Sequence, residues 1–166
     1  EYEIGKIGAD GEPRKKNAET LLHHLETSIA YTMHKRGPHG LPLIGHADWN
    51  DCLNLNCFST EPNESFQLAG DVEGSPAESV QIAGLFLYAA RELADLYTFL
   101  KRDSDAERIM ADYHVMLEIV ETEAWDGEWY KRAYDASGNP VGSKKNKEGQ
   151  IYIESQGWCI LGGAGM

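Results

Sequence analysis

Residues 75–101 read SPAESVQIAGLFLYAARELADLYTFLK, and this stretch decides the fold class. Ser75 is typical of an N-cap, Pro76 of the first helical position, and Glu78 of a side chain that reaches back to the cap amide. The apolar residues that follow cover much more than one narrow face of a helix. We therefore expect a helix that runs to about Lys101 and packs on more than one side.

Further helices are expected before and after this stretch. Apolar residues recur at helical spacing over residues 17–36. Ser104 and Glu107 repeat the capping pattern at the start of another helix, which should end near Glu123. Residues 154–156 open a last apolar segment that should also be helical. These three helices and the long one make the chain mainly α.

Irregular and extended segments complete the expected fold. Residues 1–16 should form a loop with a short strand at 2–4, and residues 37–74 a long irregular stretch of the kind that usually carries function. A short strand at 129–134 should turn back through 137–140. The sequence thus predicts helix hairpins with long loops and minor β-hairpin structure, which fits a bundle, a solenoid or an α/α barrel.

Composition limits the class of protein. The 166 residues suffice for one domain, and the formal net charge of −12 argues against nucleic acid or an anionic membrane as partner. No apolar run reaches the ~20 residues of a membrane span. The three cysteines show neither a disulfide framework nor a zinc pattern, so we expect no metal site and a reducing, cytoplasmic compartment. The chain starts with Glu1 and ends in an apolar stretch, so a fragment of a longer protein is expected.

Residues 40–59, GLPLIGHADWNDCLNLNCFS, hold the densest cluster of polar and aromatic side chains. Trp49 offers a flat apolar face of the kind that packs on a sugar ring, and Asn50 can bond to sugar hydroxyl groups. An aspartic acid beside an apolar surface keeps its proton more readily and can give it to a leaving oxygen. The cluster therefore points to carbohydrate chemistry.

Two aspartates compete for the role of acid. Spacing does not rank Asp48 against Asp51, and one of the two is expected to be structural, because aspartates often satisfy loop backbones. A hydrolase would also need a second carboxylate, ~6.5–9.5 Å away in an inverting enzyme. Glu64, Glu78 and Glu154 are candidates, although Glu78 already has an expected role as a capping residue. The chain thus indicates an acid more clearly than a base.

The stretch at 40–59 resembles the catalytic loop of cellobiose phosphorylases, which belong to glycoside hydrolase family 94. The resemblance continues, in the order of the family, through Glu-Ser-Phe-Gln at 64–67, Ala-Glu-Ser-Val at 77–80, Trp-Asp-Gly-Glu-Trp-Tyr at 125–130 and Ile-Glu-Ser-Gln-Gly-Trp at 153–158. It covers most of the chain. Chitobiose phosphorylases and cyclic glucan synthases share the Asp-Trp-Asn-Asp core, whereas the continuation LNLNCFS is more similar to cellobiose phosphorylases.

The resemblance implies part of an (α/α)6 barrel over residues 1–166, within a longer and typically dimeric enzyme. Such an enzyme converts cellobiose and phosphate reversibly, with inversion, to α-glucose 1-phosphate and glucose. The resemblance assigns the general acid to Asp51 and a wall of the non-reducing sugar subsite to Trp49. Asn50 and Asp48 are expected to bind substrate, with Asp48 also holding the loop. Inorganic phosphate is the nucleophile and co-substrate, so neither a protein base nor another cofactor is expected.

Two departures from the family limit this expectation. The upstream Arg and Asp that bind the same sugar have no counterpart here, and the segments for the second sugar and for phosphate would lie beyond Met166. We therefore expect the isolated 166 residues to be inactive and poorly folded. An inverting hydrolase on the same barrel and a non-catalytic helical carbohydrate-binding module are the alternatives.

Overall fold

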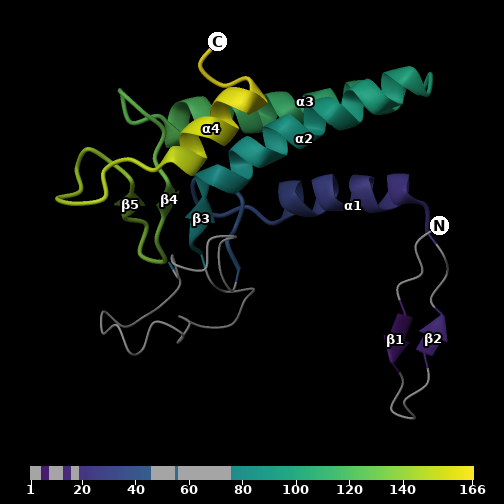
Figure 1. Ribbon diagram of the computed structural model, residues 1–166, viewed down its shortest axis with the longest axis horizontal. Helices are drawn as coiled ribbons and strands as arrows, with labels where there is room; N and C mark the ends of the chain where they lie inside the picture. Colours follow the sequence, from purple (N-terminus) through teal and green to yellow (C-terminus); the bar gives the residue numbers. More distant parts are fainter. Residues whose placement is uncertain (1–4, 8–12, 16–18, 46–54, 56–75) are drawn as a thin grey trace. The chain divides into compact units, whose positions relative to one another are not determined.

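A computed structural model describes most of the chain as two compact units (Figure 1). The units comprise Glu1–Tyr31 and Thr32–Met166, and each is described by itself. The described residues are 5–7, 13–15, 19–45, 55 and 76–166.

The first unit contains a hairpin and most of a helix. β1 (Gly5–Ile7) pairs antiparallel with β2 (Pro13–Lys15), where the sequence predicted a loop. Backbone pairing in so short a hairpin needs no apolar pattern, which explains the wrong prediction; the predicted strand at 2–4 lies outside the described residues. α1 (Leu21–His34) lies within the predicted range 17–36. The hydroxyl of Thr20 caps it by accepting a 3.1 Å hydrogen bond from the backbone N–H of His23.

The second unit is built around α2 (Val80–Phe99), which packs against two other helices (Figure 1). These are α3 (Asp103–Ile119), continued by the π-helical turn η2 (Val120–Ala124), and α4 (Ile153–Gly162). The wide apolar surface of the central helix predicted packing on more than one side, and this prediction is confirmed. Among the described residues, no helix is both long and apolar enough to cross a membrane.

The start of α2 differs from the prediction. The N-cap is Ser79, whose hydroxyl accepts a 3.1 Å hydrogen bond from the backbone N–H of Ile82. Glu78 lies outside the helix, in β3 (Glu78–Ser79), and therefore does not cap it. Ser75, the predicted cap, lies outside the described residues. The helix starts late because the backbone of residues 77–79 pairs with other strands, which the local capping pattern could not reveal.

The start of α3 also lacks the predicted capping box. The helix begins at Asp103, and its N-cap residue, Arg102, makes no capping bond with its side chain. The Arg102 guanidinium instead binds the carboxylate of Asp105, with 2.7 Å between Nε and Oδ2. This i,i+3 ion pair replaces the expected contact between Ser104 and Glu107.

Ser79→Ala is expected to lower the free energy of unfolding by about 1 kcal/mol, because an N-cap hydroxyl satisfies one of the free N–H groups of the helix. Ser104→Ala provides the matched control, since Ser104 is exposed and is not the N-cap of α3. Thermal unfolding, monitored by circular dichroism, measures the stability of both variants. An equal loss in the two variants would contradict the assignment of Ser79 as the cap.

A small antiparallel sheet lies beside the start of α2. Its strand order is β3, β4 (Ala133–Tyr134) and β5 (Pro140–Val141), with Glu78 opposite Tyr134 and Ala133 opposite Val141. The predicted strand at 129–134 is confirmed only in its last two residues. The backbone before them returns to the end of η2, where the N–H of Lys131 donates to the carbonyl of Ala124 at 2.8 Å.

The predicted turn at 137–140 is present. The carboxylate of Asp135 accepts backbone N–H bonds from Ser137 at 2.9 Å and from Asn139 at 2.8 Å. This side chain holds β4 and β5 in register. The last helix, α4, begins within one residue of the predicted segment.

Candidate functional site

The predicted site residues fall in a segment bounded by two described positions. The residues 46–54 lie outside the described part of the chain, and they include Asp48, Trp49, Asn50 and Asp51. Glu64 also lies outside the described residues. Their roles stay predictions. What the structure does place is Gly45 and Leu55, on either side of that segment, and the elements that hold them.

A hairpin-like turn precedes the motif. The N–H of Leu43 donates to the carbonyl of Lys35 at 3.0 Å, and the N–H of Gly37 donates to the carbonyl of Leu41 at 2.9 Å. Gly40 lies inside this turn with φ of 81°, a left-handed conformation that favours glycine. The chain therefore reverses between α1 and the motif.

After the turn, the chain pairs with the edge of the small sheet. The N–H of Ile44 donates to the carbonyl of Ala77, and the N–H of Ser79 donates to the carbonyl of Pro42, both at 2.9 Å. Leu43 lies opposite Glu78 in this antiparallel pairing. Residues 42–44 thus extend the sheet next to β3, and Gly45 is the last described residue before the motif.

On the other side of the segment, the chain contacts the turn that joins β4 to β5. The N–H of Ala136, which follows β4, donates to the carbonyl of Leu55 at 2.9 Å. Leu55 comes after Asp51 in the sequence, and Ile44 comes before it. The sheet and this turn therefore hold the chain by backbone bonds at one residue before and one residue after the Asp-Trp-Asn-Asp motif.

Glu78 is the most constrained carboxylate near these anchors. Its exposed fraction is 1%, and its Oε1 accepts backbone N–H bonds from His39 at 3.0 Å and from Leu41 at 3.1 Å. Its Oε2 lies 2.5 Å from Nδ1 of the His39 ring. The prediction of a capping role for Glu78 is therefore wrong, because its carboxylate binds the turn that precedes the motif. A buried group with these partners also has no room to activate a water molecule.

His39 connects Glu78 to β4. Its ring stacks on the ring of Tyr134, with centroids 3.7 Å apart and an interplanar angle of 11°. The Tyr134 hydroxyl donates to the carbonyl of Glu123 at 2.9 Å. Burial, together with the charges of Glu123 and Glu78, raises the pKa of Tyr134 to about 12, so the hydroxyl keeps its proton at neutral pH. Neither ring could be predicted from the sequence, because no local pattern links residues so far apart.

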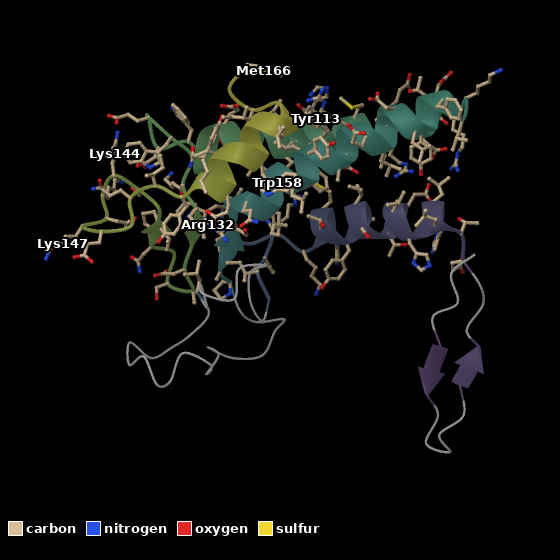
Figure 2. All side chains as sticks on the ribbon, viewed as in Figure 1. Tyr113, Arg132, Lys144, Lys147, Trp158 and Met166 are labelled. Atoms are coloured by element: carbon tan, nitrogen blue, oxygen red, sulfur yellow. The ribbon has the colours of Figure 1, made fainter. Side chains whose placement is uncertain are left out.

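Arg132 is a second buried ionic group, next to the start of α2 (Figure 2). Its backbone N–H donates to the carbonyl of Val141 at 2.8 Å, and its carbonyl accepts from the N–H of Val80 at 3.2 Å. Its guanidinium Nη1 lies 3.4 Å from the hydroxyl of Ser79. A guanidinium is tolerated in the interior only where polar groups surround it. The residue thus joins β4, β5 and α2, and the sequence around it gave no sign of its burial.

The described residues contain no cluster of three or more His, Cys, Asp or Glu side chains that could hold a metal ion. Cys159, on α4, is fully buried. Burial raises the pKa of its thiol to about 12, and the charge of Glu121 contributes a smaller part of this shift. Because the thiolate is the reactive form, the side chain is almost entirely unreactive at pH 8.

Alkylation should therefore leave Cys159 unmodified in the folded protein at pH 8 and modify it after unfolding. Treatment with iodoacetamide followed by peptide mapping measures this site separately from Cys52 and Cys57. Raising the pH toward 9 should still leave Cys159 protected, since its pKa lies higher. Rapid alkylation at pH 8 under native conditions would contradict the buried position.

Comparison with known families gives a match over nearly the whole chain. Residues 10–166 match the family described as the glycosyl hydrolase 94 superfamily, catalytic domain. The matched range includes the Asp-Trp-Asn-Asp motif, the turn before it, all strands of the small sheet, and α2 to α4.

Curated relatives are similar over the same range. The chain is 33% identical to the solabiose phosphorylase of Paenibacillus borealis over 149 residues, which cover 89% of the chain and 17% of the relative. It is 27% identical over 146 residues to the N,N'-diacetylchitobiose phosphorylase of Vibrio proteolyticus, covering 87% of the chain and 16% of the relative. It is 26% identical over 145 residues to the cellobionic acid phosphorylase of Neurospora crassa, with the same coverages.

The chain spans about one sixth of the length of these relatives. They share the word phosphorylase in their names but differ in the disaccharide that each name gives. The match to the family covers far more than half of the chain, and the mainly helical fold is consistent with it. The chain therefore belongs to the glycosyl hydrolase 94 superfamily, as a part of its catalytic domain.

Proposed function

We propose that the protein to which this chain belongs catalyses the reversible, inverting phosphorolysis of a β-1,4-linked disaccharide. The favoured reaction converts cellobiose and phosphate to α-D-glucose 1-phosphate and D-glucose. The observation that carries this proposal is the family match across residues 10–166, which contains the Asp-Trp-Asn-Asp motif. Relatives named as phosphorylases of three disaccharides support the reaction class, and the LNLNCFS continuation favours cellobiose among the sugars.

In the proposed reaction, Asp51 is the general acid. Its carboxyl group gives a proton to the glycosidic oxygen as the bond from that oxygen to C1 breaks. A phosphate oxygen bonds to C1 from the opposite face, which inverts the configuration. Hydrogen phosphate releases its proton as the sugar phosphate forms, and Asp51 takes up one proton, so the reaction is balanced. Trp49 packs on the sugar, while Asn50 and Asp48 bind it and support the loop.

Phosphate as the nucleophile agrees with the carboxylates that the structure describes. An inverting hydrolase needs a second carboxylate to activate water. Glu78 is buried and holds three donors on the turn, which removes one of the three candidates for that role. Phosphate is already an anion and needs no such base.

We further propose that this chain is part of an (α/α)6 barrel in a cytoplasmic homodimer. The described helices support the barrel, because α4 leaves large apolar side chains uncovered within the second unit. Ile153, Ile160 and Leu161 have exposed fractions of 78%, 62% and 57%. Apolar side chains at this helical spacing are what further helices of a barrel would cover.

The test is a product assay on the full-length protein. Cellobiose, solabiose, N,N'-diacetylchitobiose and cellobionic acid are each incubated with and without phosphate. Phosphorus NMR detects the sugar phosphate, and proton NMR gives its anomeric configuration. The proposal expects an α-sugar 1-phosphate that forms only with phosphate, most rapidly from cellobiose. Faster turnover of another disaccharide would leave phosphorolysis as the proposed reaction and replace cellobiose as the proposed substrate.

The alternatives give different outcomes in the same assay. An inverting hydrolase would release only free sugars at a rate that phosphate does not change. A carbohydrate-binding module would bind the disaccharide in calorimetry without any product. Either result would overturn phosphorolysis.

A further inference from the structure

We propose that Glu78 is a positioning residue, which acts with His39 and Tyr134 to fix where the segment that carries Asp51 leaves the sheet. These three residues are called the Glu78 bracket below. The inference rests on the proposed function, because it assigns Asp51 as the acid that the bracket positions.

The first step is the fit between the carboxylate and the turn. Both oxygens of Glu78 are occupied by donors from His39 and Leu41, two of them backbone N–H groups. Hydrogen bonds to a buried carboxylate are shorter and stronger than those between neutral groups. They hold the backbone of the turn itself, and residues 42–44 follow it directly onto the sheet.

Gly37 gives a second, independent sign of this fit. A Cβ atom at Gly37 would lie 2.5 Å from Cδ of Glu78 and 2.7 Å from its Oε1, closer than real Cβ atoms approach other atoms. The backbone of the turn therefore lies directly against the carboxylate. No side chain can be added there unless Glu78 gives up its position.

The bracket also joins the two anchors of the motif. Glu78 lies opposite Leu43, in the pairing that holds the side before Asp51. His39 stacks on Tyr134 in β4, and Ala136, just after β4, holds Leu55 on the side after Asp51. One carboxylate and two stacked rings thus fix the distance between the two places where the segment is attached.

Stability alone is a weak explanation for this arrangement. Burial of a carboxylate is costly, and apolar side chains of similar size often stabilise a core as well or better. A satisfied polar network does, however, specify one arrangement of the backbone. Catalysis needs one fixed arrangement of the backbone, since a displacement of an acid by about 1 Å can lower the rate about 100-fold.

The test compares variants of the full-length protein with two glucosyl donors. Cellobiose needs the proton from Asp51, whereas β-glucosyl fluoride has a leaving group that needs none. Glu78→Ala should lower kcat for cellobiose by about 100-fold and leave KM for phosphate nearly unchanged. Turnover of the fluoride should fall much less, because it depends on the segment only through the proposed sugar contacts and not through the proton of Asp51. Glu78→Gln keeps an oxygen for the two N–H groups and should recover part of the loss. Glu148→Gln, on an exposed loop residue, is the matched control and should behave as wild type.

A double-mutant cycle separates positioning from general damage. In an Asp51→Asn background, Glu78→Gln should cause almost no further loss with cellobiose, because it acts through Asp51. Equal losses with both donors, or additive losses in the cycle, would overturn the inference and indicate a purely structural role. Should Glu78→Ala fail to fold, Glu78→Gln and Gly37→Ala carry the same comparison.

The two proposals fail in different ways. If Asp51→Asn abolishes phosphorolysis while the Glu78 variants keep wild-type kcat, the bracket is refuted and the proposed function stands. If wild type forms no sugar phosphate, or Asp51→Asn keeps full activity, the proposed function fails and the inference fails with it.

Discussion

Asp51→Asn is expected to lower the turnover of disaccharide and phosphate by about 10²–10⁴-fold, because an amide cannot give a proton to the glycosidic oxygen. Sugar binding should change little, since asparagine keeps the size of the side chain and one acceptor oxygen. Initial rates in both directions of the reaction measure the loss of turnover. Calorimetry with cellobiose measures binding in the same preparation.

Asp48→Asn is the matched control for this prediction. It makes the same chemical change three positions earlier in the same motif, where the side chain is proposed to bind substrate and hold the loop. Its kcat should fall far less than that of Asp51→Asn. The opposite ranking would reverse the assignment of the acid, and equal small losses would remove both aspartates from that role.

Gly84→Ala should destabilise the packing of α2 on α4 by about 1–3 kcal/mol, the usual range for overpacking. A Cβ atom at Gly84 would lie 2.6 Å from the backbone nitrogen of Cys159 and 2.7 Å from the carbonyl carbon of Trp158. Backbone atoms cannot rotate away, so one helix would have to move. Trp158 lies on α4 beside α2 (Figure 2). Denaturant unfolding of wild type and variant measures the difference.

Gly157→Ala provides the comparison on the partner helix. Apart from the neighbouring backbone of α4, no atom of the described residues lies within 4 Å of a Cβ placed at Gly157, so within this chain the change adds only helix propensity. It should stabilise the protein by up to about 1 kcal/mol. A similar destabilisation at both glycines would contradict the close approach of the helices at Gly84.

The helices could be predicted from the sequence because each depends on local spacing. The apolar residues of α1 to α4 indicated the helices, and the wide apolar surface of α2 indicated that it packs on more than one side. The residues at which the helices begin were less predictable. Both Ser-x-x-Glu patterns suggested capping boxes. At α2, pairing of residues 77–79 with distant strands moves the start of the helix. At α3, an ion pair between Arg102 and Asp105 takes the place of the expected cap.

The site could be predicted only in part. The Asp-Trp-Asn-Asp motif is contiguous, so its chemistry could be recognised in the sequence, and the family match includes it. The Glu78 bracket combines residues from a turn, β3 and β4, which only the folded chain brings together. Gly37 comes directly after the predicted helix range 17–36, and only the structure shows that it lies against a carboxylate.

The two backbone anchors, one on the sheet and one on the turn after β4, also bear on how such an enzyme could change its substrate. The bonds at Ile44 and Leu55 are made by backbone atoms, so they do not depend on which side chains lie between these two residues. In the proposed enzyme, an exchange of side chains there would change the contacts to the sugar and leave both bonds in place. The packing of α2 against α3 and α4 would then be kept while the substrate changes.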